Sequence, residues 1–167
     1  SAFGWSALNA NTASYNTAMG AGSLNANTSG SDNSAVGNFS MYRNTTGSYN
    51  VALGSGALHD NTIGSGSNAV GFGALYGNTT AVHNNAFGFK ALHVNTTGNY
   101  NAAFGGFALT SNTTASYNSA FGYSALGSNT TGEGNSSFGY TAMMSNTTGA
   151  NNSAFGEYSL TNNTNGV

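Results

Sequence analysis

A single glycine recurs at a fixed spacing along the whole chain, and this period constrains the fold more than any other feature. The first interval is sixteen residues and the next eight are all seventeen residues long. A repeat of this length, held without insertion, is typical of a solenoid in which each repeat is one coil stacked on the last. The glycines expected at the corners of the coils are Gly4, Gly20, Gly37, Gly54, Gly71, Gly88, Gly105, Gly122, Gly139 and Gly156.

An Asn-Thr pair follows each corner glycine by seven residues and predicts a polar ladder. Stacked Asn side chains can bond amide to amide, and Asn also suits left-handed turn geometry, so a turn ladder is favoured over a binding role. The pairs are Asn11 and Thr12, Asn27 and Thr28, Asn44 and Thr45, Asn61 and Thr62, Asn78 and Thr79, Asn95 and Thr96, Asn112 and Thr113, Asn129 and Thr130, Asn146 and Thr147, and Asn163 and Thr164.

Each coil offers two stretches that read as short strands, for example 118–121 and 123–126, with Gly122 at the corner between them. Helix is excluded, because the repeat is too short for two helices and its Gly and Asn-Thr positions break any amphipathic run. We therefore predict an all-β parallel β-solenoid (β-roll) of ten coils of about 17 residues, with two short strands per coil, forming one domain over residues 1–167.

Each expected strand carries a neighbouring Ala and large apolar residue, such as Ala120 with Phe121 and Ala125 with Leu126. Neighbours in a strand point to opposite faces. Facing sheets are about 10 Å apart, a gap that Phe and Leu fill and Ala does not. Phe121, Leu126 and their equivalents are therefore predicted inside the solenoid. The Ala face is predicted outside, either as a contact between chains or as a small residue tolerated on a flat surface.

Composition excludes several functions. The chain has two basic and four acidic residues, which is too little positive charge for nucleic-acid binding. The acidic residues fall at different coil positions, and His59 and His93 lie two coils apart, so neither a catalytic carboxylate pair nor a metal site is expected. No apolar run approaches membrane length. We therefore expect no enzyme activity, no cofactor and no membrane insertion.

Two groups of motifs carry a resemblance to known families. The stretches 16–20, 33–37 and 118–122 resemble the repeat core of the head domains of trimeric autotransporter adhesins. The longer unit at 125–132 looks even more like repeats of phage tail-fibre and related surface-fibre proteins. The resemblance implies a left-handed parallel β-roll, a homotrimer and an extracellular location on a cell surface, a virion tail or a secreted filament.

Three further features of the sequence fit other functions. The threonine file resembles the Thr arrays of ice-binding solenoids, although these need two parallel files on one face. Recurrent aromatic residues could stack on the sugar rings of a surface glycan or receptor, or on one another. Several asparagines form glycosylation sequons that would coat a glycosylated extracellular filament, namely Asn44, Asn78, Asn95, Asn112, Asn129 and Asn146.

Both ends of the chain fall inside a coil, and no capping segment is visible in the sequence. We therefore expect a segment of a longer fibre, or a unit that polymerises end to end. The function predicted from these features is a structural or adhesive fibre segment that serves as a rigid shaft or a receptor-binding head.

Overall fold

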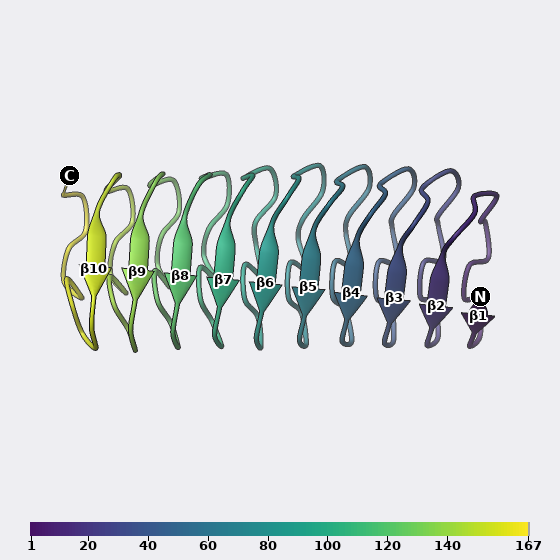
Figure 1. The fold of residues 1–167 in the computed structure, drawn as a ribbon, viewed down its shortest axis with the longest axis horizontal. Helices are drawn as coiled ribbons and strands as arrows, with labels where there is room; N and C mark the ends of the chain where they lie inside the picture. Colours follow the sequence, from purple (N-terminus) through teal and green to yellow (C-terminus); the bar gives the residue numbers. More distant parts are fainter. Residues whose placement is uncertain (167) are drawn as a thin grey trace.

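The computed structural model describes residues 1–166, and these form a parallel β-solenoid (Figure 1). Ten strands build one sheet in which each strand pairs only with its neighbours in the sequence. They are β1 (Ala2–Phe3), β2 (Thr17–Met19), β3 (Ser34–Val36), β4 (Val51–Leu53), β5 (Asn68–Val70), β6 (Asn85–Phe87), β7 (Ala102–Phe104), β8 (Ser119–Phe121), β9 (Ser136–Phe138) and β10 (Ser153–Phe155). The parallel solenoid is thus confirmed, and its handedness stays a prediction.

Strand register repeats without a slip from coil to coil. In the pairing of β8 with β9, Ser119 lies beside Ser136 and Phe121 beside Phe138. The same three positions pair in each successive coil, because the period of seventeen residues is constant there. Every residue type that recurs in the sequence therefore forms a continuous file along the long axis of the molecule.

The second strand predicted for each coil is wrong. After the corner glycine, residues 123–128 and their equivalents form a series of turns, which we call the return segment. Ser124 and Leu126 have φ angles of 53° and 53°, far from the negative φ of a strand. The segment still bonds to the next coil, since Leu126 N–H donates to Ala142 O at 3.0 Å. The solenoid therefore has one sheet and one wall of stacked turns.

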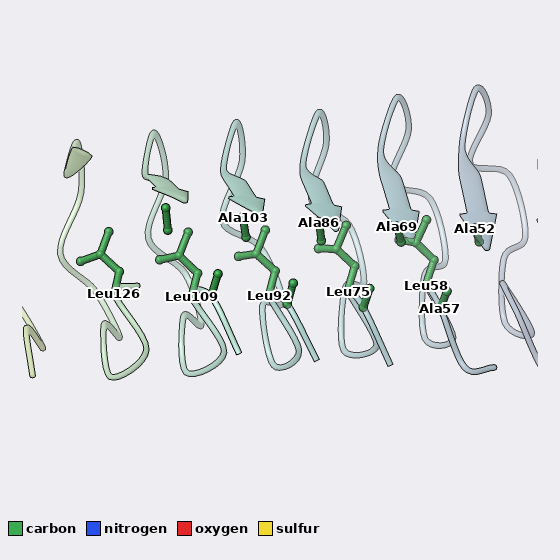
Figure 2. Packing of buried hydrophobic residues seen from close by; sticks show 14 of the residues in the cluster. Ala52, Ala57, Leu58, Ala69, Leu75, Ala86, Leu92, Ala103, Leu109 and Leu126 are labelled. Atoms are coloured by element: carbon green, nitrogen blue, oxygen red, sulfur yellow. The ribbon is translucent and has the colours of Figure 1, made fainter. Parts of the chain in front are cut away.

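Alanine, with one Leu or Met per coil, fills the space between these two walls (Figure 2). Ala120, Ala125 and Leu126 are all fully buried, whereas the Phe121 side chain lies on the outer face of the sheet and is partly exposed. The prediction for Leu126 is confirmed, and the predictions that Phe121 is interior and that Ala faces outward are wrong. The walls lie close enough for Ala and Leu to fill the gap.

Left-handed backbone explains why neighbouring Ala125 and Leu126 are both interior. The rule that neighbours face opposite sides holds for extended chains. A Leu or Met with φ near 50° occurs at this position in every coil, and it turns its side chain to the same side as the preceding residue. Such a φ is uncommon for Leu, and stacking against the adjacent coils holds it in place.

The corner glycines are required both by their φ angle and by space. Gly71 has a φ of 131°, and a Cβ built there would lie 2.5 Å from the carbonyl oxygen of Gly88 in the next coil. No other residue type fits this combination without moving the backbone. The same close approach occurs at Gly37, Gly54, Gly88, Gly105, Gly122 and Gly139. Within residues 1–166 there is no helix suited to crossing a membrane.

Candidate functional site

The Asn residues of the Asn-Thr pairs form a buried amide ladder inside the solenoid. Asn44 Nδ2 donates to Asn27 Oδ1 of the preceding coil at 2.7 Å and to Gly47 O of its own turn at 2.9 Å. Asn61 Nδ2 in turn donates to Asn44 Oδ1. This pattern runs through Asn78, Asn95, Asn112, Asn129 and Asn146, all fully buried. The ladder expected from the sequence is present, and its role is structural.

A second buried Asn file lies just before the strands. Asn33 Oδ1 accepts the backbone N–H of Asn50 at 3.0 Å, and Asn50 Nδ2 donates to Gly64 O at 2.9 Å. Ser67 takes the equivalent place in the next coil and accepts the N–H of Asn84 at 3.2 Å. Two polar files thus satisfy the backbone of the long turn without using any charge.

Glycosylation of the six sequon asparagines is incompatible with the folded chain. A glycan would be joined to Nδ2, yet this atom donates two internal hydrogen bonds in Asn44, Asn95 and their equivalents. These residues are fully buried. The sequons are therefore a by-product of the turn chemistry, and the sites suggested at Asn44, Asn78, Asn95, Asn112, Asn129 and Asn146 are wrong for the folded state.

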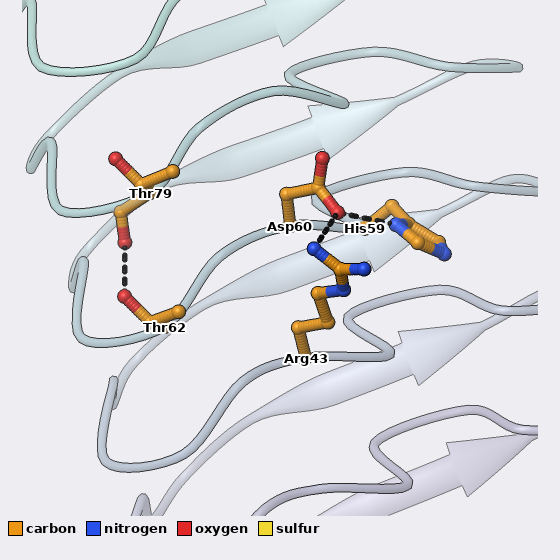
Figure 3. Close-up of polar contacts among 5 residues, drawn as sticks. All are labelled: Arg43, His59, Asp60, Thr62 and Thr79. Atoms are coloured by element: carbon orange, nitrogen blue, oxygen red, sulfur yellow. Dashed lines mark hydrogen bonds and ion pairs between the residues drawn. The ribbon is translucent and has the colours of Figure 1, made fainter.

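The threonines of the Asn-Thr pairs form a file whose hydroxyl groups bond to the protein itself. Thr45 Oγ1 donates to Thr62 O at 2.9 Å. Thr62 Oγ1 donates in the same way to Thr79 O at 2.9 Å (Figure 3). The bonds continue through Thr96, Thr113, Thr130 and Thr147. Because each hydroxyl hydrogen is used along the stack, these donors are not offered to ice. The ice-binding alternative gains no support from this geometry.

Arg43 and Asp60 make one small cluster with His59. Asp60 Oδ1 lies 2.8 Å from Nδ1 of His59 and 3.5 Å from an Arg43 guanidinium nitrogen, and Arg43 comes from the preceding coil (Figure 3). The described part of the chain contains no group of three or more side chains arranged to hold a metal ion. His59 and His93 are separated by Tyr76, which stacks on His59 with a ring separation of 4.6 Å. This cluster is a neutralised surface feature.

A stripe of large apolar residues runs along the outer face of the sheet. It consists of the residue before each corner glycine: Phe3, Met19, Val36, Leu53, Val70, Phe87, Phe104, Phe121, Phe138 and Phe155. In its second half five phenylalanine rings stack, at separations from 4.7 to 5.0 Å. Phe87 is 37% exposed and Phe155 70%. We call this file the apolar stripe.

A hollow of about 320 Å³ opens beside the return segments of the middle coils. The residues two places after the corner glycine in four consecutive coils are Phe39, Gly56, Gly73 and Lys90. The two glycines in the middle of this file provide no side chain. The remaining lining residues are Ser55, Phe72, His59, Tyr76 and His93. The volume is at the lower end of the range for small-molecule sites.

Sequence reasoning missed this hollow although a signal was present. The residue two places after each corner glycine is Phe39, Gly56, Gly73 and Lys90 in four consecutive coils. Aligning the coils at this position shows two missing side chains between an aromatic ring and a cation. The aromatic residues alone predict stacking on sugar rings or on one another, and neither prediction places them beside this gap.

The fold and its side-chain files define a β-solenoid repeat protein. No protein-family model, no curated protein and no solved structure matches the chain. The likeness to tail-fibre repeats and adhesin heads therefore rests on the sequence motifs alone.

Proposed function

We propose that this chain is a non-enzymatic structural segment of an extracellular homotrimeric fibre, from a phage tail or a microbial surface, in which the apolar stripe forms the contact between chains. The observation that carries the proposal is the stripe itself. Exposed and partly exposed members alternate along it from Met19 to Phe87, and it continues from coil to coil without a polar residue. Such a continuous apolar file is typical of an interaction surface, because isolated monomers rarely leave a large apolar area in water.

The repeat of the stripe favours a second copy of the same chain as its partner. Phe104 and Phe121 stack at 4.7 Å, and the next pair at 4.8 Å, so the surface presents one ring per coil. A partner that contacts every ring needs the same repeat along its length. Another copy of this solenoid has the same repeat. Its stripe is also apolar and uncharged, so the two stripes can pack against each other.

Three features support a shaft role. The buried polar side chains are Asn, Ser and Thr and none is charged, each coil bonds to both neighbours, and the residues typical of catalysis are scattered. The number of chains, three, follows from the resemblance of stretches such as 118–122 to adhesin heads. The Ala faces named in the sequence analysis are buried inside the coil and play no part in this contact.

Solution mass measurement tests the proposal. The parent chain is expected to have three times the mass of one chain in light scattering or native mass spectrometry. The double variant Phe104→Ser and Phe121→Ser is expected to remain folded, because both rings lie on the outer face, and to dissociate to a monomer.

A matched control uses another stacked aromatic pair. Tyr100 and Tyr117 stack at 5.4 Å and are exposed, but they precede the strands and lie outside the stripe. Tyr100→Ser with Tyr117→Ser is expected to keep the parent mass. A parent chain that stays monomeric at all concentrations, or a stripe variant that keeps the parent mass, contradicts the proposal.

A further inference from the structure

The hollow between Phe39 and Lys90 has the shape of a site for one sugar ring. Phe72 lines it together with His59, Tyr76 and His93. His59 stacks on Tyr76 at 4.6 Å, and the His93 ring is tilted by 41° against Tyr76 at 5.4 Å. Apolar ring faces and edges pack against the C–H groups of a pyranose. Gly56 and Gly73 add no side chain of their own, and rings of the next coil pack against them. A Cβ built at Gly56 would lie 3.2 Å from the Tyr76 ring, and one built at Gly73 would lie 3.2 Å from the His93 ring.

Both histidines have a fixed proton arrangement that suits sugar hydroxyls. His93 Nδ1 lies 2.8 Å from Gly73 O, and His59 Nδ1 lies 2.8 Å from Asp60 Oδ1. Because these oxygens only accept, each Nδ1 carries the proton, and in the neutral ring Nε2 is left as an acceptor. The Ser55 hydroxyl adds a group that can donate or accept. A polyhydroxylated ligand therefore finds both kinds of partner around the same hollow.

Lys90 gives the hollow its charge preference. Its ammonium group lies 5.5 Å from the centre of the Phe89 ring and, among the described residues, has no carboxylate partner. The other basic residue, Arg43, is paired with Asp60. An unpaired cation at one end of an aromatic hollow favours a ligand with one carboxylate.

We propose that this hollow binds one acidic monosaccharide unit of a glycan, with its ring between Phe72 and Tyr76 and its carboxylate on Lys90. The site goes beyond a shaft function and needs only a single solenoid. None of its lining residues belongs to the apolar stripe, so it does not depend on association through that face.

Calorimetric or NMR titration with the methyl glycosides of glucuronic acid and glucose tests the site. The parent chain is expected to bind the glucuronide with a Kd on the order of 1 mM, and glucose at least about fivefold more weakly. Lys90→Met keeps the apolar stem and is expected to remove this difference without changing glucose binding. Gly73→Phe is expected to abolish binding of both sugars, because it fills the hollow.

Each variant has a matched control. Arg43→Met removes the other cation, which does not line the hollow. Ser124→Phe adds a ring at the coil position equivalent to Gly73, beside a second hollow that has no charged lining residue. Phe107 occupies this position with a φ of 61°, so the backbone accepts Phe. Both controls are expected to bind the two sugars as the parent chain does.

Three results would overturn the site: equal binding of both sugars, no glucuronide binding by the parent chain, or an unchanged preference in Lys90→Met. The titration is repeated on the double variant Phe104→Ser with Phe121→Ser. Sugar binding is thereby measured independently of association through the apolar stripe. Binding by that form but not by the parent would assign the hollow to a contact between copies, which also overturns the proposal.

Discussion

Replacing Asn112 by Leu is expected to lower the free energy of unfolding by about 3 kcal/mol, although Leu is apolar and of similar size. Asn112 is fully buried and is the seventh Asn of the amide ladder. Its Nδ2 donates to Asn95 Oδ1 at 2.9 Å and to Ala115 O at 2.9 Å, and its Oδ1 accepts from Asn129 Nδ2 at 3.0 Å. The substitution removes all three bonds.

The magnitude follows from the groups left without a partner. Ala115 O keeps a bond from Asn101 Nδ2 at 2.9 Å. Asn95 Oδ1 and one Nδ2 hydrogen of Asn129 are left without a protein partner in the buried interior, and each unsatisfied group costs about 1–3 kcal/mol. Leu burial offsets part of this cost. Asn112→Asp keeps the side-chain shape, removes both donors and buries a carboxylate, so it is expected to destabilise at least as much.

Guanidinium denaturation followed by circular dichroism measures the change, with Thr114→Leu as the control. Thr114 is exposed in the same coil, and its substitution is expected to change the unfolding free energy by less than about 0.5 kcal/mol. Hydrogen exchange of the flanking coils shows whether the loss spreads to neighbours, as expected in a stacked repeat. An Asn112→Leu chain as stable as the parent would refute the view that the ladder stabilises the solenoid.

Three further substitutions test the interior. Ala120→Leu is expected to unfold the middle coils, or to lower the unfolding free energy by about 1–3 kcal/mol in thermal melts, because Ala120 faces the gap filled by Leu side chains. An unchanged melting curve together with a changed association state would show that Ala120 faces outward. Gly71→Ala places a Cβ 2.5 Å from Gly88 O and is expected to cost more than about 2 kcal/mol by chemical denaturation, and a neutral result would contradict the corner geometry. Ser67→Asn completes the second Asn file by adding a bond to Ala81 O, and a gain of about 1 kcal/mol is expected; a lower melting temperature would show that this coil lacks room.

The sequence by itself determined the solenoid, its coil length and its polar ladders. A corner glycine every seventeen residues leaves few alternatives, because an unbroken period brings like residues into files whatever the path of one coil. The sequence predicts Leu126 and its equivalents inside, which is confirmed except in the two terminal coils, where Leu8 is partly buried and Leu160 is exposed. It also predicts the ladder of Asn-Thr pairs. These conclusions depend on spacing, which is visible in one dimension.

Only the tertiary structure decided which side chains of each wall face the interior, for example Ala120 and not Phe121. The position of Phe121 depends on the distance between the walls, and that distance is set by left-handed residues such as Ser124 and Leu126, which the alternation rule does not anticipate. The tertiary structure also buries the side-chain amides of the sequon asparagines, so that no glycan can be attached to them in the folded chain. The hollow beside Lys90 arises only where files from different coil positions meet, so its chemistry appears when the coils are stacked in space.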